Sequence, residues 1–327
     1  MRKDHEPNIV LIGGGTGLSY VLKGLKKYPV NITAIVTVGD NGGSSGKIRS
    51  SIHIVPPGDI RKVLVALSEA EPLLNQLLNF RFDQDDHLFA NHTVGNIILT
   101  ALYYINDGDY IRAIKQLGKV LNVRGKVLPV ATEPVTLVAK MCDGSVVIGE
   151  SEITKDPNRI EEITLLEKDR ITTYDEVLEA IAGADLIVFG PGSLYTSIIP
   201  NVLIPQVREA ILASKAEKVY VCNVMTEPGE TDHFTVSDHV LTLEKYLAPG
   251  VIDTIFANDG YDVAEEVMAS YRKTGAELVR IDLDQLAKLG KELITSRFIY
   301  VNEKNHIRHN SLKIAAYIVM KLLDQFE

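Results

Sequence analysis

The sequence predicts an α/β fold in which helices cover both faces of a mainly parallel sheet. Short apolar runs typical of buried strands recur along the chain, and stretches with helical spacing lie between several of them. The first apolar run ends at a glycine-rich turn, and a helical pattern follows at once. Strand, glycine turn and helix in this order are typical of the entrance to a nucleotide-binding domain of this class.

Five apolar runs are expected to be strands, and each ends at loop residues. They are Ile9–Ile12, Ile32–Val38, Leu186–Phe189, Val219–Cys222 and Val251–Phe256. The helical patterns include Leu18–Lys27, Ile60–Ala70, Asn96–Ile105, Ile198–Leu212 and Ala264–Lys273. Because ligands of open parallel sheets bind at the carboxyl ends of the strands, we expect the functional residues in the loops that follow these runs.

Residues 121–170 depart from this alternation and show β patterns with few helical signals. Val135–Met141 and Val146–Glu150 flank the dipeptide Asp143-Gly144, which is a strong hairpin signal, and Ile163–Leu166 can add a strand. We interpret 121–170 as an antiparallel β segment inserted in a single domain that spans 1–327. A structural lid or a dimerisation element is favoured over a catalytic role for it.

The composition limits the class of protein. The 327 residues are 46% hydrophobic and carry a formal net charge of −9, so a nucleic-acid-binding surface is not expected as the main function. Two cysteines without a C-x-x-C pattern indicate reduced thiols and a cytoplasmic protein. No apolar stretch approaches the ~20 residues of a membrane-spanning helix, and the charged stretch 1–8 does not resemble a signal peptide.

The turn after the first strand is the strongest candidate for binding phosphate. Its residues are Gly13, Gly14, Gly15, Thr16 and Gly17. Glycines allow the backbone to approach a diphosphate closely, and the free N–H groups of the first helical turn point at it. The spacing G-x-G-x-G has Leu18 where the dinucleotide fingerprint requires its third glycine, so the turn differs from a standard NAD loop.

The loop after the second strand holds Asp40, Asn41 and Gly42, followed by further glycines and serines that could form an anion-binding nest. It is not a P-loop, because Asn41 stands at the first glycine position and Ile48 stands where a serine or threonine would hold magnesium. Asp40 could meet a ribose hydroxyl, bind a metal ion or cap the loop, and the sequence leaves these roles open.

Three later stretches add polar candidates. Asp59 is expected to cap the helix that begins near it, whereas Arg61 opposes the dipole of that helix and is better explained by an anionic ligand. Gly192 and Ser193 lie at a second strand-to-helix junction, whose hydroxyl groups suit a phosphate or a ribose. The polar loop 223–231 suits hydrogen bonds to a base or a sugar.

Six separated motifs occur in order along the chain. They are Gly13-Gly14-Gly15-Thr16-Gly17, Asp40-Asn41-Gly42-Gly43-Ser44-Ser45-Gly46, Pro57-Gly58-Asp59-Ile60-Arg61, Gly95-Asn96, Gly190-Pro191-Gly192-Ser193-Leu194-Tyr195 and Asn223-Val224-Met225-Thr226. Together they resemble the CofD/YvcK family, over about 8–323, and within it the YvcK-like branch described as gluconeogenesis factors. Several motifs in the right order are far more specific than one glycine loop.

The resemblance implies a Rossmann-like three-layer core with an inserted portion. In the CofD branch, a 2-phospho-L-lactate group passes from a GDP-activated donor to a deazaflavin alcohol, with Mg²⁺. The YvcK-like branch is not an established enzyme; it is linked to cell shape, peptidoglycan precursor supply, gluconeogenic growth and binding of UDP-sugars such as UDP-N-acetylglucosamine. Its ligand-binding tyrosine and arginine correspond to Tyr261 and Arg297, where a ring can stack on uracil and a guanidinium can clamp a diphosphate.

Three functions remain open on the sequence. The first is a cytoplasmic protein that binds a nucleotide-sugar and senses or channels a cell-wall precursor, and no cofactor is assigned to it. The second is a CofD-type transferase, in which Asp40 would hold Mg²⁺ or act as the catalytic base. The third is an NAD-binding protein, against which the missing third glycine counts. A homodimer is compatible with each of them, since dimers are common in such folds.

Overall fold

The computed structural model describes residues 6–86, 88–168 and 170–324, so part of the charged stretch 1–8 lies outside it. Its centre is a seven-stranded sheet in the order β10-β9-β8-β7-β1-β2-β3, and all neighbouring strands in it are parallel. The strands are β1 (Asn8–Gly13), β2 (Asn31–Val36), β3 (Lys126–Pro129), β7 (Leu186–Phe189), β8 (Glu217–Val221), β9 (Thr254–Asn258) and β10 (Glu292–Ser296). The expected α/β class with a mainly parallel sheet is confirmed.

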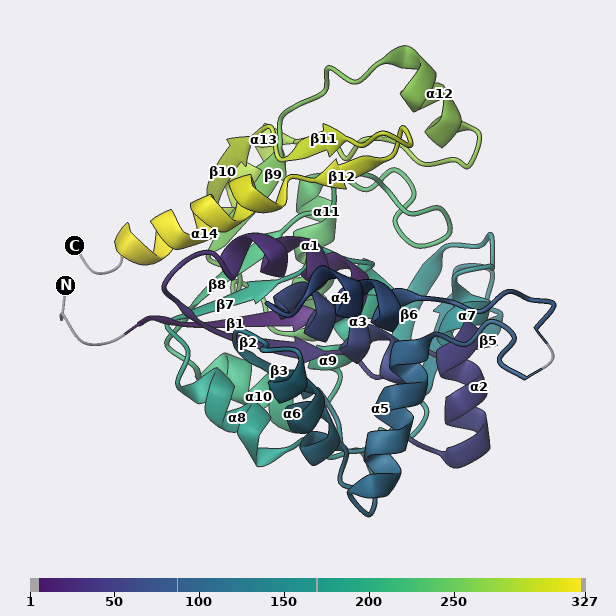
Figure 1. Ribbon diagram of the computed structural model, residues 1–327. Helices are drawn as coiled ribbons and strands as arrows, with labels where there is room; N and C mark the ends of the chain where they lie inside the picture. Colours follow the sequence, from purple (N-terminus) through teal and green to yellow (C-terminus); the bar gives the residue numbers. More distant parts are fainter. Residues whose placement is uncertain (1–5, 87, 169, 325–327) are drawn as a thin grey trace.

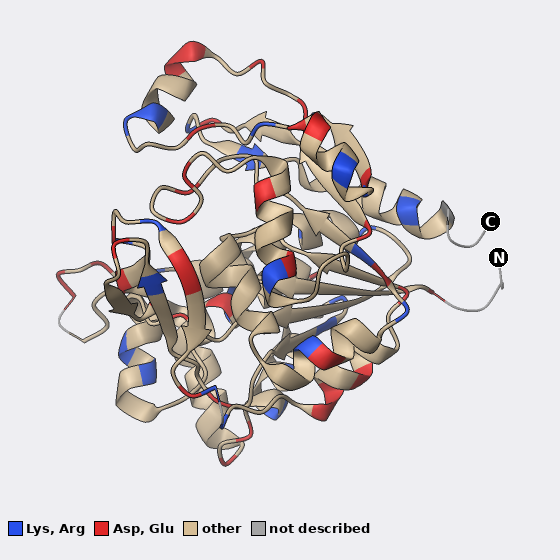
Figure 2. Ribbon diagram, turned by 180° about the vertical axis from the view of Figure 1, so that it is seen from behind, with Lys and Arg blue, Asp and Glu red and all other residues tan. Residues whose placement is uncertain are grey.

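Helices cover both faces of this sheet. On one face α1 (Gly15–Leu25) packs against α3 (Pro57–Leu67) and α14 (Ser311–Asp324). On the other face α8 (Asp175–Ala182) packs against α10 (Pro205–Ala213), as Figure 1 shows. Strand β7 is buried along its whole length between these layers, which is why its sequence is a continuous apolar run. Charged residues lie mostly in the outer helices and loops (Figure 2).

One expected helix is wrong as a single element. The stretch Ile198–Leu212 is divided among three elements. They are the end of a π-helical turn η1 (Leu194–Ile198), the short helix α9 (Ile199–Val202) and α10. Pro200 and Pro205 cause the division, because each lies at the start of a new helix and lacks the N–H group that a continuous helix needs.

The segment 121–170 is divided between two sheets. Strand β3 pairs with β2 and so extends the central sheet, which the sequence patterns did not predict. The rest includes a separate antiparallel sheet in the order β5-β4-β6. Its strands are β4 (Leu137–Met141), β5 (Val146–Ile148) and β6 (Ile160–Leu165), and the short helix α7 (Glu150–Ile153) follows β5. The inserted antiparallel segment is therefore present, over a shorter range than 121–170.

The remaining elements are helices and one hairpin around the central sheet and its covering helices. They are α2 (Gly43–Ile52), α4 (Pro72–Asn79), α5 (Val94–Ile105), α6 (Tyr110–Val120), α11 (Val236–Tyr246), α12 (Glu265–Arg272), α13 (Leu283–Leu289) and the hairpin of β11 (Ile299–Val301) and β12 (Ile307–His309). No helix in the described part of the chain is both long and apolar enough to cross a membrane.

Candidate functional site

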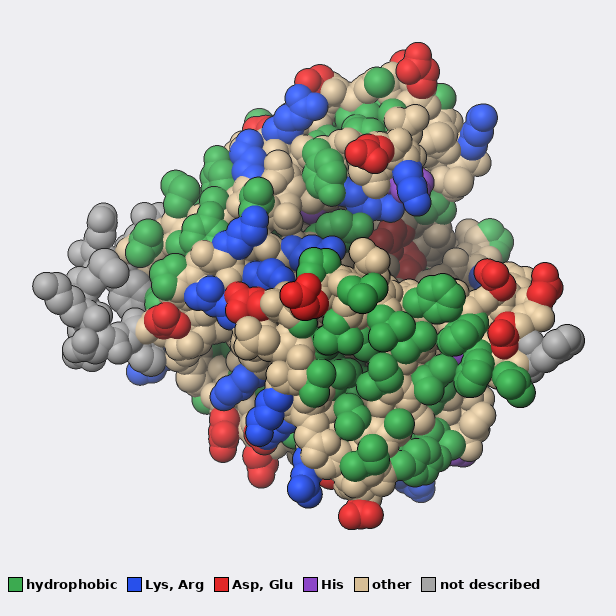
Figure 3. Space-filling view, viewed as in Figure 1, with side chains coloured by type: hydrophobic (Ala, Val, Ile, Leu, Met, Phe, Trp, Pro, Cys, Tyr) green, Lys and Arg blue, Asp and Glu red, His purple; other side chains and the backbone are tan. Residues whose placement is uncertain are grey.

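The carboxyl ends of the central strands form the edge at which the predicted site residues gather. The chain runs from β1 through β2 to β3 on one side of β1, and from β7 through β8 and β9 to β10 on the other, so the strand order reverses between β1 and β7. Open α/β sheets bind their ligands at such a switch point. Figure 3 shows a hollow at this side of the molecule, below the part that carries β11, β12 and α12, with acidic side chains at its bottom.

The glycine turn joins β1 to α1 at the switch point. Gly14 is the N-cap residue of α1, no side chain caps the helix, and its first turn holds no acidic residue. Gly17 lies so close to the next loop that an added Cβ would be 1.9 Å from the carbonyl oxygen of Pro191. An added Cβ at Gly15 would be 2.5 Å from Cα of Asp59. Close packing of α1 therefore accounts for Gly15 and Gly17, and the uncapped end of the helix faces the edge where a ligand would bind.

Asp40 lies in a cluster of carboxylates just beyond β2. Its Oδ1 accepts a hydrogen bond from the Gly42 amide at 2.9 Å. Burial raises the pKa of Asp40, and the neighbouring Asp59 raises it further. The Nζ of Lys62 is 2.8 Å from Oδ1 of Asp59 and 3.0 Å from Oγ1 of Thr16, so one ammonium group joins this cluster to the glycine turn.

The position of Asp59 corrects one expectation from the sequence. Helix α3 begins at Pro57 and its N-cap residue is Pro56, so Asp59 lies inside the first turn and does not cap the helix. The start is earlier than expected because proline has no N–H group to satisfy and is already set at a helical φ. Asp59 is therefore available to the carboxylate cluster.

The inserted segment adds a third carboxylate to the cluster, Glu150 at the start of α7. Burial raises the pKa of Glu150 to about 8, and Asp40 and Asp59 raise it as well. The Ser151 amide donates to Oδ1 of Asn41 at 2.8 Å, so α7 is fixed against the Asp40 loop. Sequence reasoning missed Glu150, because it ends a predicted hairpin strand and no spacing relates it to Asp40.

Carboxylates such as Asp40, Asp59 and Glu150 are possible ligands of a metal ion. Among the residues that the structure describes, no group of three or more His, Cys, Asp or Glu side chains is arranged to hold one. Mg²⁺ is commonly bound by one or two carboxylates together with substrate phosphates and water. Asp40 and its neighbours could therefore hold Mg²⁺ together with a phosphate-bearing ligand, but not as a complete protein site.

Arg61 is buried, and its hydrogen bonds link neighbouring helices. Its Nε donates to Oδ1 of Asn96 at 3.1 Å, and its guanidinium also bonds the side chain of Asn79 at the end of α4. Asn96 in turn donates to Oγ of Ser44 at 3.0 Å. These bonds connect α2, α3, α4 and α5. In this structure the guanidinium of Arg61 donates to the amide oxygens of Asn96 and Asn79. The anionic ligand expected for Arg61 stays a prediction.

The loops after β7 and β8 are joined to each other. Gly192 donates to Oδ1 of Asn223 at 3.1 Å, and Nδ2 of Asn223 donates back to the Gly192 carbonyl at 2.9 Å. Thr226 is buried, and its Oγ1 accepts a hydrogen bond from the Glu277 amide at 3.0 Å. Gly192 and Asn223 thus lie side by side at the switch point, whereas Thr226 holds two loops together.

Two glutamates that sequence reasoning did not single out lie behind these loops. Glu230 is 4% exposed; its Oε1 accepts a hydrogen bond from Thr196 at 3.1 Å, and its Oε2 has no partner within the described residues. Burial raises the pKa of Glu230 to about 8, with a contribution from the nearby Glu227. Burial also raises the pKa of Glu227, while a hydrogen bond from Ser193 opposes the shift. The charge of Glu227 therefore makes the ionised form of Glu230 less favourable.

Tyr261 and Arg297 follow β9 and β10 at the same edge of the sheet. Tyr261 is 44% exposed, and its hydroxyl accepts a hydrogen bond from the Ile281 amide at 3.2 Å, which fixes the ring. Nη1 of Arg297 donates to Asp262 at 2.7 Å, and both side chains of this ion pair are at least half exposed. The stem of Arg297 lies against Gly260, where an added Cβ would be 2.5 Å from its Cγ.

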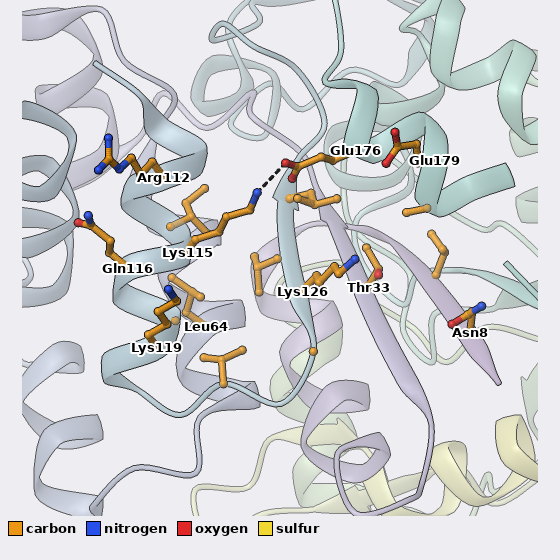
Figure 4. A pocket seen from close by; sticks show the side chains of 18 of the residues that line it. Asn8, Thr33, Leu64, Arg112, Lys115, Gln116, Lys119, Lys126, Glu176 and Glu179 are labelled. Carbon is orange, nitrogen blue, oxygen red and sulfur yellow. Dashed lines mark hydrogen bonds and ion pairs between the residues drawn. The ribbon is translucent and has the colours of Figure 1, made fainter. Parts of the chain in front are cut away.

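Two cavities lie beside other parts of the fold. One, of about 1090 Å³, is near the amino ends of β1, β2 and β3; the ion pair between Lys115 of α6 and Glu176 of α8 lies within it, as Figure 4 shows. It is lined by none of the predicted site residues. The other, of about 1130 Å³, lies beside α2 and has Asn41 as its one predicted site residue. The switch point, where the predicted site residues gather, is therefore the better candidate.

Comparison with known proteins agrees with this geometry. The family model of 2-phospho-L-lactate transferase CofD matches residues 9–299. Proteins named gluconeogenesis factor are similar to the chain: that of Bacillus subtilis is 47% identical over 96% of this chain and 98% of its own, and that of Halalkalibacterium halodurans is 48% identical over 95% of each. A crystal structure of a UPF0052 family protein from Bacillus halodurans superposes with a TM-score of 0.91 at 47% identity, over 96% of this chain and 99% of that one. The chain belongs to the CofD family.

Proposed function

We propose that this protein binds a nucleotide-sugar of the UDP-N-acetylglucosamine type and regulates gluconeogenic growth, cell shape and peptidoglycan precursor supply in the cytoplasm. The supporting observation is that two kinds of group share one edge of the sheet: the uncapped glycine turn after β1, and the exposed Tyr261 with Arg297 after β9 and β10. Strand β9 lies three positions from β1, which is ~14 Å at ~4.8 Å per strand. An extended nucleotide-sugar spans a comparable length. The relatives' name, gluconeogenesis factor, supports the physiological part.

The charges favour one orientation of the ligand. The cluster of Asp40, Asp59 and Glu150 is poorly suited to a diphosphate, because the ammonium of Lys62 is already paired with Asp59, whereas carboxyl groups exchange hydrogen bonds with sugar hydroxyls. Tyr261 presents an exposed ring to a base, and Arg297 can exchange its surface partner Asp262 for a diphosphate. We therefore place the uridine diphosphate end at Tyr261 and Arg297, and the sugar end at the glycine turn and the Asp40 loop.

Regulation would follow from a shift between two conformations of the inserted segment. Its helix α7 contacts the Asp40 loop through the bond from Ser151 to Asn41. A sugar held by Asp40 and Glu150 would stabilise the closed arrangement of this segment, and a partner protein could distinguish the closed surface from the open one.

Calorimetric titration tests the proposal directly. The full chain is titrated with UDP-N-acetylglucosamine, GDP and NAD, each with and without Mg²⁺. We expect selective binding of the UDP-sugar and no product after long incubation. Equal affinity for all three ligands, or none for the UDP-sugar, would contradict it.

Replacing Arg297 by alanine is expected to weaken UDP-sugar binding by ~10- to 100-fold, because a charge-assisted hydrogen bond is worth ~1.5–3 kcal/mol. The thermal stability should change little, since an exposed ion pair contributes at most ~1 kcal/mol. Arg272→Ala is the matched control, because Arg272 also forms an exposed ion pair, with Glu265. Unchanged affinity of Arg297→Ala would remove Arg297 from the site.

A transferase of the CofD type is the second candidate, supported by the family model and by the position of Asp40. The raised pKa of Asp40 suits a group that takes a proton from an acceptor hydroxyl. A phosphate-bearing donor could complete a Mg²⁺ site at Asp40. Preference for GDP with a Mg²⁺ requirement, and turnover of a GDP-activated donor with a deazaflavin alcohol, would favour this function over the regulator.

A further inference from the structure

The cavity of about 1090 Å³ lies at the opposite end of the central strands from the switch point. Asn8 and Lys126, the first residues of β1 and β3, line it, whereas the switch point lies beyond the carboxyl ends of the strands. Helix α6 lies on one side of the cavity and α8 on another (Figure 4). Its volume is at the upper end of the range of ~300–1000 Å³ that is usual for a small-molecule site.

Four cationic side chains of the described residues line this cavity. Arg112, Lys115 and Lys119 are three and four residues apart on α6, so they share one face of the helix. Lys126 adds a fourth cation from β3. Like charges at this spacing weaken a helix, and the whole chain carries a net charge of −9. The average composition therefore does not explain why these cations gather here.

Carboxylates balance only part of this charge. Two of the described residues that line the cavity carry one, Glu176 and Glu179 of α8. Nζ of Lys115 is 2.6 Å from Oε1 of Glu176, and this ion pair joins α6 to α8 (Figure 4). The other three cations form no ion pair with any residue that the structure describes. Both members of the pair are about half exposed, so an anion from solution can replace Glu176 at little cost.

The edge position of β3 does not explain this group of cations. Strand β3 is last in the order of the sheet, and lysine is common on edge strands because its charge discourages pairing with another chain. That reason applies to Lys126 alone, because the other cations lie on α6 and line the same cavity. Buried apolar side chains, among them Val10, Leu64 and Val127, complete the lining. Ammonium groups beside an apolar wall suit an organic molecule that carries phosphate groups.

We propose that this cavity is a second binding site, which takes a small metabolite with two or more phosphate groups. Lys115, Lys119 and Lys126 hold the phosphates, and Glu176 gives up its ion pair with Lys115 when the metabolite binds. The site is separate from the nucleotide-sugar site proposed at the switch point, so either can be present without the other.

Calorimetric titration of the full chain with glucose 1,6-bisphosphate tests the proposal, with glucose as the neutral comparator. The wild type is expected to bind one bisphosphate per chain and no glucose, with an affinity that falls as NaCl is added. Lys119→Glu/Lys126→Glu should raise the dissociation constant at least ~10-fold, because two attracting charges become repelling ones. Glu176→Gln should lower the dissociation constant, because it frees Lys115 and removes a carboxylate from the cavity.

The matched control is Lys288→Glu/Lys304→Glu, which changes the net charge equally at two exposed lysines outside the cavity. It should leave the affinity for the bisphosphate unchanged, and so should Arg297→Ala, which alters the opposite edge of the sheet. A wild type that does not bind the bisphosphate would overturn the proposal. So would a control pair that weakens binding as much as Lys119→Glu/Lys126→Glu does. Near-native thermal unfolding of the variants excludes misfolding as the cause of a loss.

Discussion

Gly17→Ala is expected to destabilise the protein by about 3 kcal/mol or more, whereas Gly118→Ala should leave it equally stable or more stable by up to ~1 kcal/mol. Both glycines lie inside α-helices, α1 and α6. A Cβ at Gly17 would be 1.9 Å from the carbonyl oxygen of Pro191 and 2.6 Å from its carbonyl carbon, and backbone atoms cannot rotate away as a side chain can. Helix α1 would have to move from the switch point, and because the clash is with backbone, the cost is expected at or above the upper end of the ~1–3 kcal/mol that overpacking typically causes.

Gly118 provides the matched control because its surroundings are open. An added Cβ there would be 3.8 Å from Leu64 and Val123, which is ordinary van der Waals contact. Alanine in place of a helical glycine then stabilises by ~0.5–1 kcal/mol through the unfolded chain. Urea unfolding of the two variants and the wild type measures the difference. Similar stability for Gly17→Ala and Gly118→Ala would mean that α1 does not pack against the Pro191 loop as described.

This pair also shows what the glycine pattern could and could not predict. The sequence places Gly13 to Gly17 between a strand and a helix; the structure has the junction there, but Gly13 ends β1 and α1 begins at Gly15, three residues before the expected Leu18. Glycine was predicted there because a backbone can approach a ligand closely. The structure adds a second cause, since Gly15 and Gly17 are where α1 contacts other parts of the same chain. A short sequence pattern is the same for both kinds of close approach, so it could not distinguish them.

The positions of the candidate residues were predicted best where they follow strands and least where they depend on contacts between distant segments. Asp40, Gly192 and Asn223 follow β2, β7 and β8, and parallel strands bring such positions to one edge. Glu150 reaches Asp40 only because the inserted sheet folds back, and Glu230 is buried by loops that have no periodic pattern. Strand β3 was missed for a similar reason, since its four residues are too few to show a period.

Glu230→Gln is expected to stabilise the protein at alkaline pH, and Glu244→Gln to destabilise it both at pH 5 and at pH 8.5. Both glutamates are buried, at 4% and 5% exposure. Glu244 is 2.8 Å from the ammonium of Lys291, so its replacement leaves a buried positive charge without its partner and should cost ~3–5 kcal/mol. Glu230 has no cation and lies near Glu227, so its charged form is the unfavourable one.

The pH dependence follows from the raised pKa of Glu230. The ordinary pKa of a glutamate is 4.5 and that of Glu230 is about 8, so the folded chain holds more protons than the unfolded chain between these values. The contribution of Glu230 to stability is therefore complete below pH 4.5, is lost as the pH rises to about 8, and stays constant above that, with a slope of at most ~1.4 kcal/mol per pH unit.

Thermal or urea unfolding at pH 5 and at pH 8.5 measures this difference. Near pH 5 the Glu230 carboxyl is neutral in the folded chain, so Glu230→Gln should differ from the wild type by less than ~1 kcal/mol. At pH 8.5 the variant should be more stable by ~1–3 kcal/mol, because the wild type must then either bury a charge beside Glu227 or hold a proton against the solvent. A variant that loses stability equally at both pH values would show instead that the charged carboxylate of Glu230 is stabilised in the fold, as that of Glu244 is by Lys291.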